Sequence, residues 1–128
     1  MSRYVIDTYA WVEYFIGSEK GERVKQFVES SENEIFTSIV TIAEITSITK
    51  RENRDAEQIY LKIIDLSTVY GLDKEFSKKV GLLHAEIKKK IKDFGLIDAF
   101  ILLTARKLNA KVITGDKHFK GFKEAILI

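Results

Sequence analysis

Short apolar runs alternate along the chain with longer stretches of helical periodicity. The runs predicted to be strands are residues 3–7 (RYVID), 34–38 (EIFTS), 67–71 (STVYG), 110–115 (AKVITG) and 124–128 (EAILI). They are apolar on both faces, as strands covered by helices on both sides should be. This alternation of strand and helix is typical of an α/β fold built on a parallel sheet.

Helices are predicted between these strands. Apolar residues recur every three or four positions in 74–92 and 54–65, which is the period of an amphipathic helix. The stretch 96–109 is apolar nearly all round in its first turns, so we expect it to lie deep in the domain, with Asn109 as its C-terminal cap. We also assign a helix to 39–52, although its threonines and β-branched residues lower helix propensity.

Two acids lie at the ends of predicted strands. Asp7 is the last residue of the first strand, and Asp116 follows the fourth in the sequence VITGD. In a parallel α/β sheet, ligands bind beyond the carboxyl ends of the strands, where the strand-to-helix loops gather. Both acids are therefore predicted to lie at the edge of the sheet where chemistry is done.

Two further acids interrupt the apolar helices. Glu44 shares a stripe with Val40 and Ile48, and Asp98 opens the most apolar helix. Burying a lone carboxylate costs several kcal/mol or forces it to take up a proton, and no Lys or Arg lies at helical spacing in these stripes. We expect both acids to be buried and to converge with Asp7 and Asp116 at one edge of the sheet.

Four carboxylates without a cysteine or histidine among them form a set of hard oxygen donors suited to Mg²⁺ or Mn²⁺. Such ions bridge protein carboxylates to substrate phosphates, so the reaction this set favours is hydrolysis of a phosphodiester. Two ions about 4 Å apart could catalyse this hydrolysis, and so could one ion together with a carboxylate that acts as general base. The sequence leaves both arrangements open.

Each acid also has a purely structural interpretation. Asp7 fits the N-cap of a following helix, Asp98 a first-turn acid that complements the helix dipole, and Asp116 a Gly-Asp turn. Glu44 fits a structural role least well, because its neighbours at helical spacing are apolar. The placement of all four at one sheet edge favours a functional site and weakens the capping interpretation of Asp7.

Composition narrows the class of protein without deciding the function. The 128 residues, 45% hydrophobic and 31% charged, are predicted to form one folded domain over residues 1–128. The net charge of +2 neither requires nor excludes a nucleic-acid partner. The absence of cysteine excludes disulfides and thiolate sites, and the sequence has neither a signal-peptide pattern nor a long apolar run, so we expect a cytoplasmic protein.

Four motifs in the same order resemble one known family. They are VIDTYAWVEYF (5–15), TIAEI (41–45), GLIDAFILLTARKLNA (95–110) and VITGDKHFKGF (112–122). With these motifs the chain resembles the PIN-domain (PilT N-terminus) ribonucleases, and in particular the VapC-type toxins of toxin–antitoxin pairs. Each motif is short, but together they span nearly the whole chain.

The resemblance implies a three-layer α/β/α sandwich with a twisted, mostly parallel central sheet. It also implies an endoribonuclease that cleaves RNA with Mg²⁺ or Mn²⁺, that forms a homodimer and that is inhibited by a cognate antitoxin. The catalytic and metal-binding acids of the family fall on four residues of this chain, namely Asp7, Glu44, Asp98 and Asp116.

Other polar residues near these motifs carry weaker expectations. Thr8 and Thr114 match positions where members of the family often carry a supporting hydroxyl, whereas Tyr9 stands where many have Ser. Lys117 is the best candidate for a contact with a substrate phosphate. His118 is interpreted as a structural or solvent-facing residue rather than a participant in the reaction.

Three other α/β classes lack support in the sequence. The phosphatases of the haloacid-dehalogenase type need a second Asp two residues after the first, where Tyr9 stands, and response-regulator receivers need an acceptor Asp directly after the third strand. No glycine-rich phosphate loop is present either. Two alternatives to a toxin remain open, namely an RNA-processing nuclease of the same fold and a PIN-fold module that binds RNA or protein without cleaving.

Overall fold

The computed structural model describes residues 1–128 and contains five strands and six α-helices. In chain order the elements are β1 (Ser2–Ile6), α1 (Thr8–Ile16), α2 (Glu19–Val28), β2 (Asn33–Ser38), α3 (Ile39–Arg51), α4 (Ala56–Leu66), β3 (Thr68–Tyr70), α5 (Lys74–Lys88), α6 (Leu96–Leu108), β4 (Lys111–Thr114), the 3₁₀ turn η1 (Lys117–Phe119) and β5 (Ala125–Leu127). None of the helices is both long enough and apolar enough to cross a bilayer.

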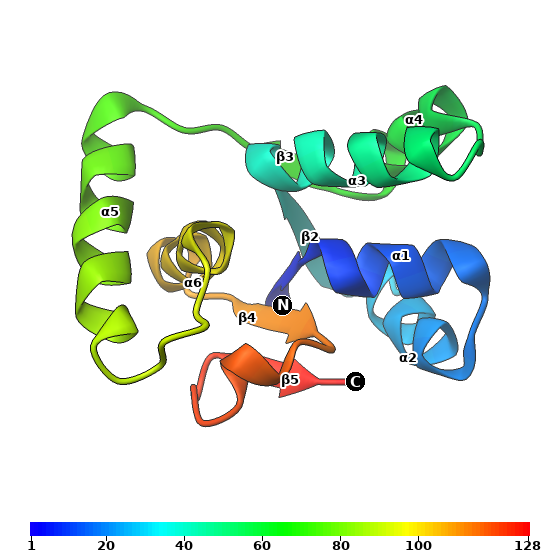
Figure 1. Cartoon of the computed structure of the whole chain (residues 1–128). Coiled ribbons are helices and arrows are strands. Elements are labelled where there is room, and N and C mark those ends of the chain that lie inside the picture. The colour runs from blue at the N-terminus through cyan, green and yellow to red at the C-terminus, as the bar shows by residue number, and fades with distance from the viewer.

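The five strands form one sheet in the order β3-β2-β1-β4-β5, and every neighbouring pair is parallel. From β1 the chain adds β2 and β3 on one side and then places β4 and β5 on the other (Figure 1). The direction of winding therefore reverses between β1 and β4. In sheets of this kind, the crevice beyond the carboxyl ends of two such strands is the usual position of a ligand site.

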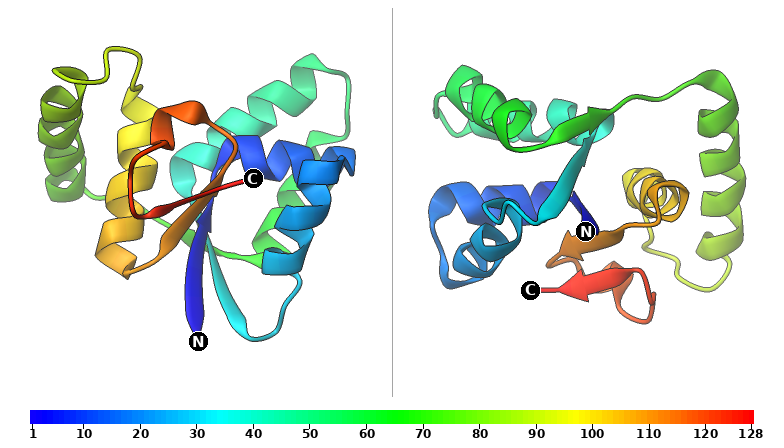
Figure 2. Two further views of the ribbon diagram at one scale, coloured as in Figure 1. Left: turned by 90° about the horizontal axis from the view of Figure 1, so that it is seen from below. Right: turned by 180° about the vertical axis from the view of Figure 1, so that it is seen from behind.

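Helices cover both faces of the sheet, which confirms the predicted three-layer α/β/α sandwich. Figure 2 shows α5 and α6 on one side of the sheet and α1 and α2 on the other. Consecutive strand residues point to opposite faces. Val5 and Val112 accordingly belong to the core cluster with residues of α5 and α6, whereas Ile6 and Ile113 pack in a second cluster with residues of α1 to α4.

The five predicted strands and the four predicted helices are all present. Each strand lies inside its predicted range or begins within one residue of it. The stretch 39–52 is helical as assigned, since α3 spans Ile39–Arg51. Asn109 caps α6 in the left-handed conformation, with φ 52° and ψ 48°. Asn109 thus ends α6 as the sequence predicted and turns the chain toward β4.

Two helices, α1 and α2, were not assigned from the sequence pattern, although the capping interpretation of Asp7 implied a helix at the position of α1. The second of these is strongly polar and contains Gly21, which lowers its helix propensity. A Cβ at this position would overlap the backbone oxygen of Glu13, so the glycine lets α2 pack directly against α1. Since that close contact is tertiary, the local sequence pattern does not reveal it.

Two details of the predicted helices are wrong. The helix expected over 74–92 ends at Lys88, because the following residues turn the chain back so that Phe94 can enter the core, where it is fully buried. The stretch 96–109, which was expected to lie deep in the domain, forms α6, but the first turn of α6 is partly exposed, since Leu96 is 49% exposed. This open turn of α6 lies next to the crevice between β1 and β4.

Candidate active site

Asp7 follows the last residue of β1 and is the N-cap of α1. Its Oδ1 accepts a hydrogen bond of 2.9 Å from the backbone N–H of Ala10, and its own N–H donates to the carbonyl of Ile113 in β4. The capping interpretation of Asp7 is therefore correct. It does not exclude a second function, because the same carboxyl group also lines a cavity beyond the strand ends.

The carboxyl group of Asp7 is buried, with only 6% of the residue exposed. Its pKa is raised to about 7, mainly by burial and to a smaller extent by the nearby negative charges of Asp116 and Asp98. Hydrogen bonds from the Thr114 hydroxyl and the Ala10 N–H act in the opposite direction. None of the ion pairs in the structure joins a Lys or Arg to Asp7. A buried acid is thus held among like charges without a cationic partner.

Thr114 links Asp7 to Asp116. Its side chain is fully buried at the end of β4, where it hydrogen-bonds to Asp7 and accepts the N–H of Asp116 at 2.9 Å. Asp116 in turn accepts the N–H of His118 at 2.8 Å and so begins the 3₁₀ turn η1. The turn interpretation of Asp116 is therefore also correct, and the turn fixes its carboxylate beside that of Asp7.

Asp98 is the third residue of α6 and faces the same crevice from the other side of β4. Its Oδ2 accepts the N–H of Gly95 at 3.0 Å, which closes the first turn of the helix. Partial burial raises the pKa of Asp98, as does repulsion from Asp116, whereas contact with His118 lowers it. The helix thus presents this carboxylate to Asp116 across the crevice.

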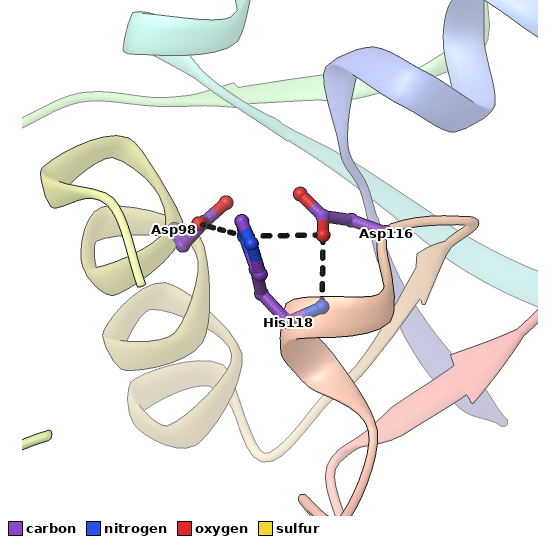
Figure 3. A group of neighbouring side chains, drawn as sticks. All are labelled: Asp98, Asp116 and His118. Atoms are coloured by element: carbon purple, nitrogen blue, oxygen red, sulfur yellow. Dashed lines mark hydrogen bonds and ion pairs between the residues drawn. The ribbon is translucent and has the colours of Figure 1, made fainter. Parts of the chain in front are cut away.

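His118 bridges two of these acids, which the sequence interpretation did not foresee. Its Nδ1 lies 3.3 Å from Asp98 Oδ2 and 3.2 Å from Asp116 Oδ1, as Figure 3 shows. One potential ligand atom from each of Asp98, Asp116 and His118 lies within 4.8 Å of the other two. The clue in the sequence was the spacing, since one 3₁₀ turn after Asp116 folds the ring back over the acids.

Glu44 reaches the site from α3. Its Oε1 accepts a hydrogen bond of 2.6 Å from the Thr8 hydroxyl, so Thr8 holds Glu44 as Thr114 holds Asp7. The expectation that Glu44 and Asp98 are buried is wrong, since both are half-buried. They open onto the crevice instead of the core, and the fully enclosed acid is Asp7.

The four predicted acids line one cavity of 130 Å³ at the carboxyl edge of the sheet. The complete lining is Asp7, Thr8, Tyr9, Glu44, Ile97, Asp98, Ile101 and Asp116. Lys117, the predicted phosphate contact, is exposed on η1 and is not part of this lining. The structure thus brings the acids together, while Lys117 stays at the periphery.

The donor set fits a divalent cation. Carboxylate oxygens are hard donors of the kind preferred by Mg²⁺ and Mn²⁺, and here they repel one another without a compensating Lys or Arg. The imidazole of His118 adds a nitrogen donor that the sequence interpretation had not included. Mixed sets of carboxylate and imidazole donors bind divalent cations in proteins.

Comparison with known proteins identifies the family. The model of the PIN domain matches residues 4–125, and the chain therefore belongs to the PIN domain family. No curated protein sequence matches the chain.

Solved structures with the same fold include a toxin–antitoxin complex from Klebsiella pneumoniae, with a TM-score of 0.75 and 21% identity over 96% of this chain and 95% of that chain. VapC20 of Mycobacterium tuberculosis, described as a sarcin–ricin loop cleaving toxin, has a TM-score of 0.73 and 16% sequence identity, over 94% of this chain and 97% of that chain. VapBC-1 from nontypeable Haemophilus influenzae has a TM-score of 0.71 and 22% sequence identity, over 98% of this chain and 96% of that chain. These structures confirm the fold.

Replacing Asp7 with Asn should stabilise the metal-free protein at high pH. Between the ordinary pKa of 3.8 and about 7, the folded protein keeps a proton on Asp7 that the unfolded chain has lost, so the free energy of unfolding falls as the pH rises through this window. Asn retains the capping oxygen without the charge. We expect a gain of roughly 2–4 kcal/mol at pH 8 and almost none at pH 4, measured by urea unfolding in chelator.

The control for this measurement is Asp65→Asn, which removes an exposed acid from α4. Its effect on the free energy of unfolding should be small at both pH values. A gain for Asp7→Asn that does not grow between pH 4 and pH 8 would contradict the assignment of Asp7 as a buried, uncompensated acid.

Mn²⁺ should stabilise the folded protein through these carboxylates. At a free concentration 100 times the dissociation constant, a ligand that binds only the folded state adds about 2.7 kcal/mol to the free energy of unfolding. We expect thermal unfolding to move to higher temperature with Mn²⁺ and to return with chelator. The double variant Asp98→Asn/Asp116→Asn should lose the shift, whereas Asp65→Asn should keep it. An equal shift in the double variant would place the metal elsewhere.

Proposed function

We propose that the chain is a metal-dependent endoribonuclease that hydrolyses RNA phosphodiesters. The observation that carries this proposal is the convergence of four carboxylates, from four separate segments of the chain, on one cavity without a Lys or Arg partner. Membership of the PIN domain family supports it, as does the fold shared with a toxin that cleaves the sarcin–ricin loop. A divalent cation held by hard carboxylate ligands binds phosphate oxygens, so a phosphodiester is the substrate that fits this site.

The proposed metal ligands are Asp7, Glu44, Asp98 and Asp116. A bound Mg²⁺ or Mn²⁺ would supply an activated water and neutralise charge on the phosphate. A two-ion arrangement and a single ion with a general-base carboxylate would use the same four acids. The hydroxyl groups of Thr8 and Thr114 orient Glu44 and Asp7, so the acids are held in place before substrate binds.

Asp7 couples metal binding to proton release. With a pKa of about 7, its carboxyl group is partly protonated at neutral pH, and it must lose that proton to bind a cation. The exposed Lys117 on η1 stays our proposal for a contact with a flanking phosphate, because it lies one residue beyond Asp116 at the rim of the site.

Two other functions use the same fold. An RNA-processing nuclease would share the chemistry but differ in its target, and a binding module would hold RNA or protein without cleaving it. The binding module is disfavoured, because without catalysis the burial of Asp7 and its repulsion with Asp98 and Asp116 would have no compensating use. The toxin and processing roles are distinguished only in cells.

Cleavage of single-stranded RNA should require both the metal and the acids. We expect the purified protein to cleave a labelled single-stranded RNA with Mg²⁺ or Mn²⁺, and chelator to abolish the reaction. Asp98→Asn and Asp7→Asn should each lower the rate by about 100-fold or more, because each removes a proposed ligand. The exposed variant Asp65→Asn should cleave like the parent protein. Cleavage in chelator, or equal rates for all variants, would refute the proposal.

The proposed biological role is the VapC-type toxin of a toxin–antitoxin pair, acting as a homodimer. Structures of such pairs share the fold, which supports an antitoxin as partner. Expression of the chain in a bacterial host should arrest growth, and Asp98→Asn should not. Co-expression of the small protein encoded next to the gene should restore growth and co-purify with the chain. Equal growth with the parent and Asp98→Asn proteins would favour the processing role.

A further inference from the structure

Tyr9 stands at the mouth of the acidic cavity without a place in the core. It is the second residue of α1, is 39% exposed and lines the cavity beside the four carboxylates. It belongs to neither of the two core clusters, unlike its neighbours Ala10 and Trp11. Packing of the core therefore does not account for a large aromatic ring at this position.

Gly115 makes room for the ring. A Cβ at this position would overlap the Cε1 atom of Tyr9, so the aromatic ring rests directly on the main chain between Thr114 and Asp116. Gly115 does not have a positive φ, which means that backbone conformation does not require glycine there. Gly115 leaves the space that the Tyr9 ring occupies.

Lys20 of α2 contacts the hydroxyl end of the ring. Its Nζ donates a hydrogen bond of 2.9 Å to the Tyr9 hydroxyl and lies 5.1 Å from the ring centroid. Lys20 takes part in none of the ion pairs of the structure. An ammonium group carries three donors, so two remain for a ligand. A cation is thus held next to an aromatic ring at the rim of an otherwise acidic site.

We propose that Tyr9 is a stacking platform for a nucleobase next to the cleaved phosphodiester, and that Lys20 contacts a neighbouring phosphate. This inference rests on the proposed ribonuclease function. A base presents a flat face for stacking and its phosphate presents a negative charge, so one nucleotide satisfies both groups at once. The cation also offsets the repulsion between the acids and the incoming phosphates.

Stacking on an aromatic ring is tolerant of sequence, because every base has a π face. The platform therefore sets where the strand lies relative to the acids more than which base is read. A single-stranded substrate follows from this geometry, since a base inside a duplex cannot turn its face to Tyr9.

The test measures binding of a labelled single-stranded octaribonucleotide, and of the same RNA with one nucleotide at a time lacking its base. Asp98→Asn protein prevents cleavage during the measurement. With Asp98→Asn as the parent protein in this test, Tyr9→Leu should weaken binding of the intact RNA about tenfold, whereas Tyr9→Phe should change the affinity by no more than about twofold. Loss of the base at one position should weaken binding by the parent by a similar factor and leave Tyr9→Leu unaffected.

Lys20→Met should weaken binding and reduce the slope of log affinity against log salt by about one, as loss of one phosphate contact does. Lys25→Met is the matched control, because Lys25 lies on the same helix, carries the same charge and does not contact Tyr9. It should leave the salt dependence unchanged.

The stacking proposal would be refuted if, at every position of the RNA, removal of the base weakened binding to the Tyr9→Leu protein as much as to the protein with Tyr9. It would also be refuted if both proteins bound the intact RNA equally. A parent protein that binds no RNA at all would contradict the ribonuclease proposal itself. Circular dichroism melting of each variant separates loss of the platform from loss of the fold. A Tyr9→Leu protein that melts like the parent yet binds the RNA about tenfold more weakly would support the platform.

Discussion

The arrangement of the site depends on one costly placement, the burial of the Asp7 carboxyl group between the ends of β1 and β4. The acid is enclosed, has neighbours of the same charge and has no Lys or Arg partner. Its position follows from the topology, because β1 and β4 are the strands between which the winding of the sheet reverses. Asp116 and Asp98 are brought to Asp7 by the two segments that flank β4.

The fold tolerates this placement because each acid also closes a piece of secondary structure. Asp7 caps α1, Asp98 closes the first turn of α6, and Asp116 begins η1. The structural and functional interpretations of these residues are therefore complementary, since a carboxylate has two oxygens and a cap uses one of them. Two core clusters, one on each face of the sheet, hold the strand ends that carry them.

The sequence predicted those parts of the structure that depend on local pattern. Strands covered on both faces are apolar runs, and α3 and α6 keep a helical period, so both were found. The helix α2 was missed because its glycine is explained by contact with α1, and the burial of Glu44 was overestimated because its apolar neighbours lie beside an open crevice. The position of His118 depended on a turn whose direction only the tertiary structure sets.

Gly115 shows how the same short loop serves two purposes. It separates Thr114, which holds Asp7, from Asp116, and it also provides the surface on which Tyr9 rests. The chain pairs the large ring of Tyr9 with a glycine and a lysine. Because the ring, the glycine and the lysine come from three separate segments, the sequence alone did not connect them.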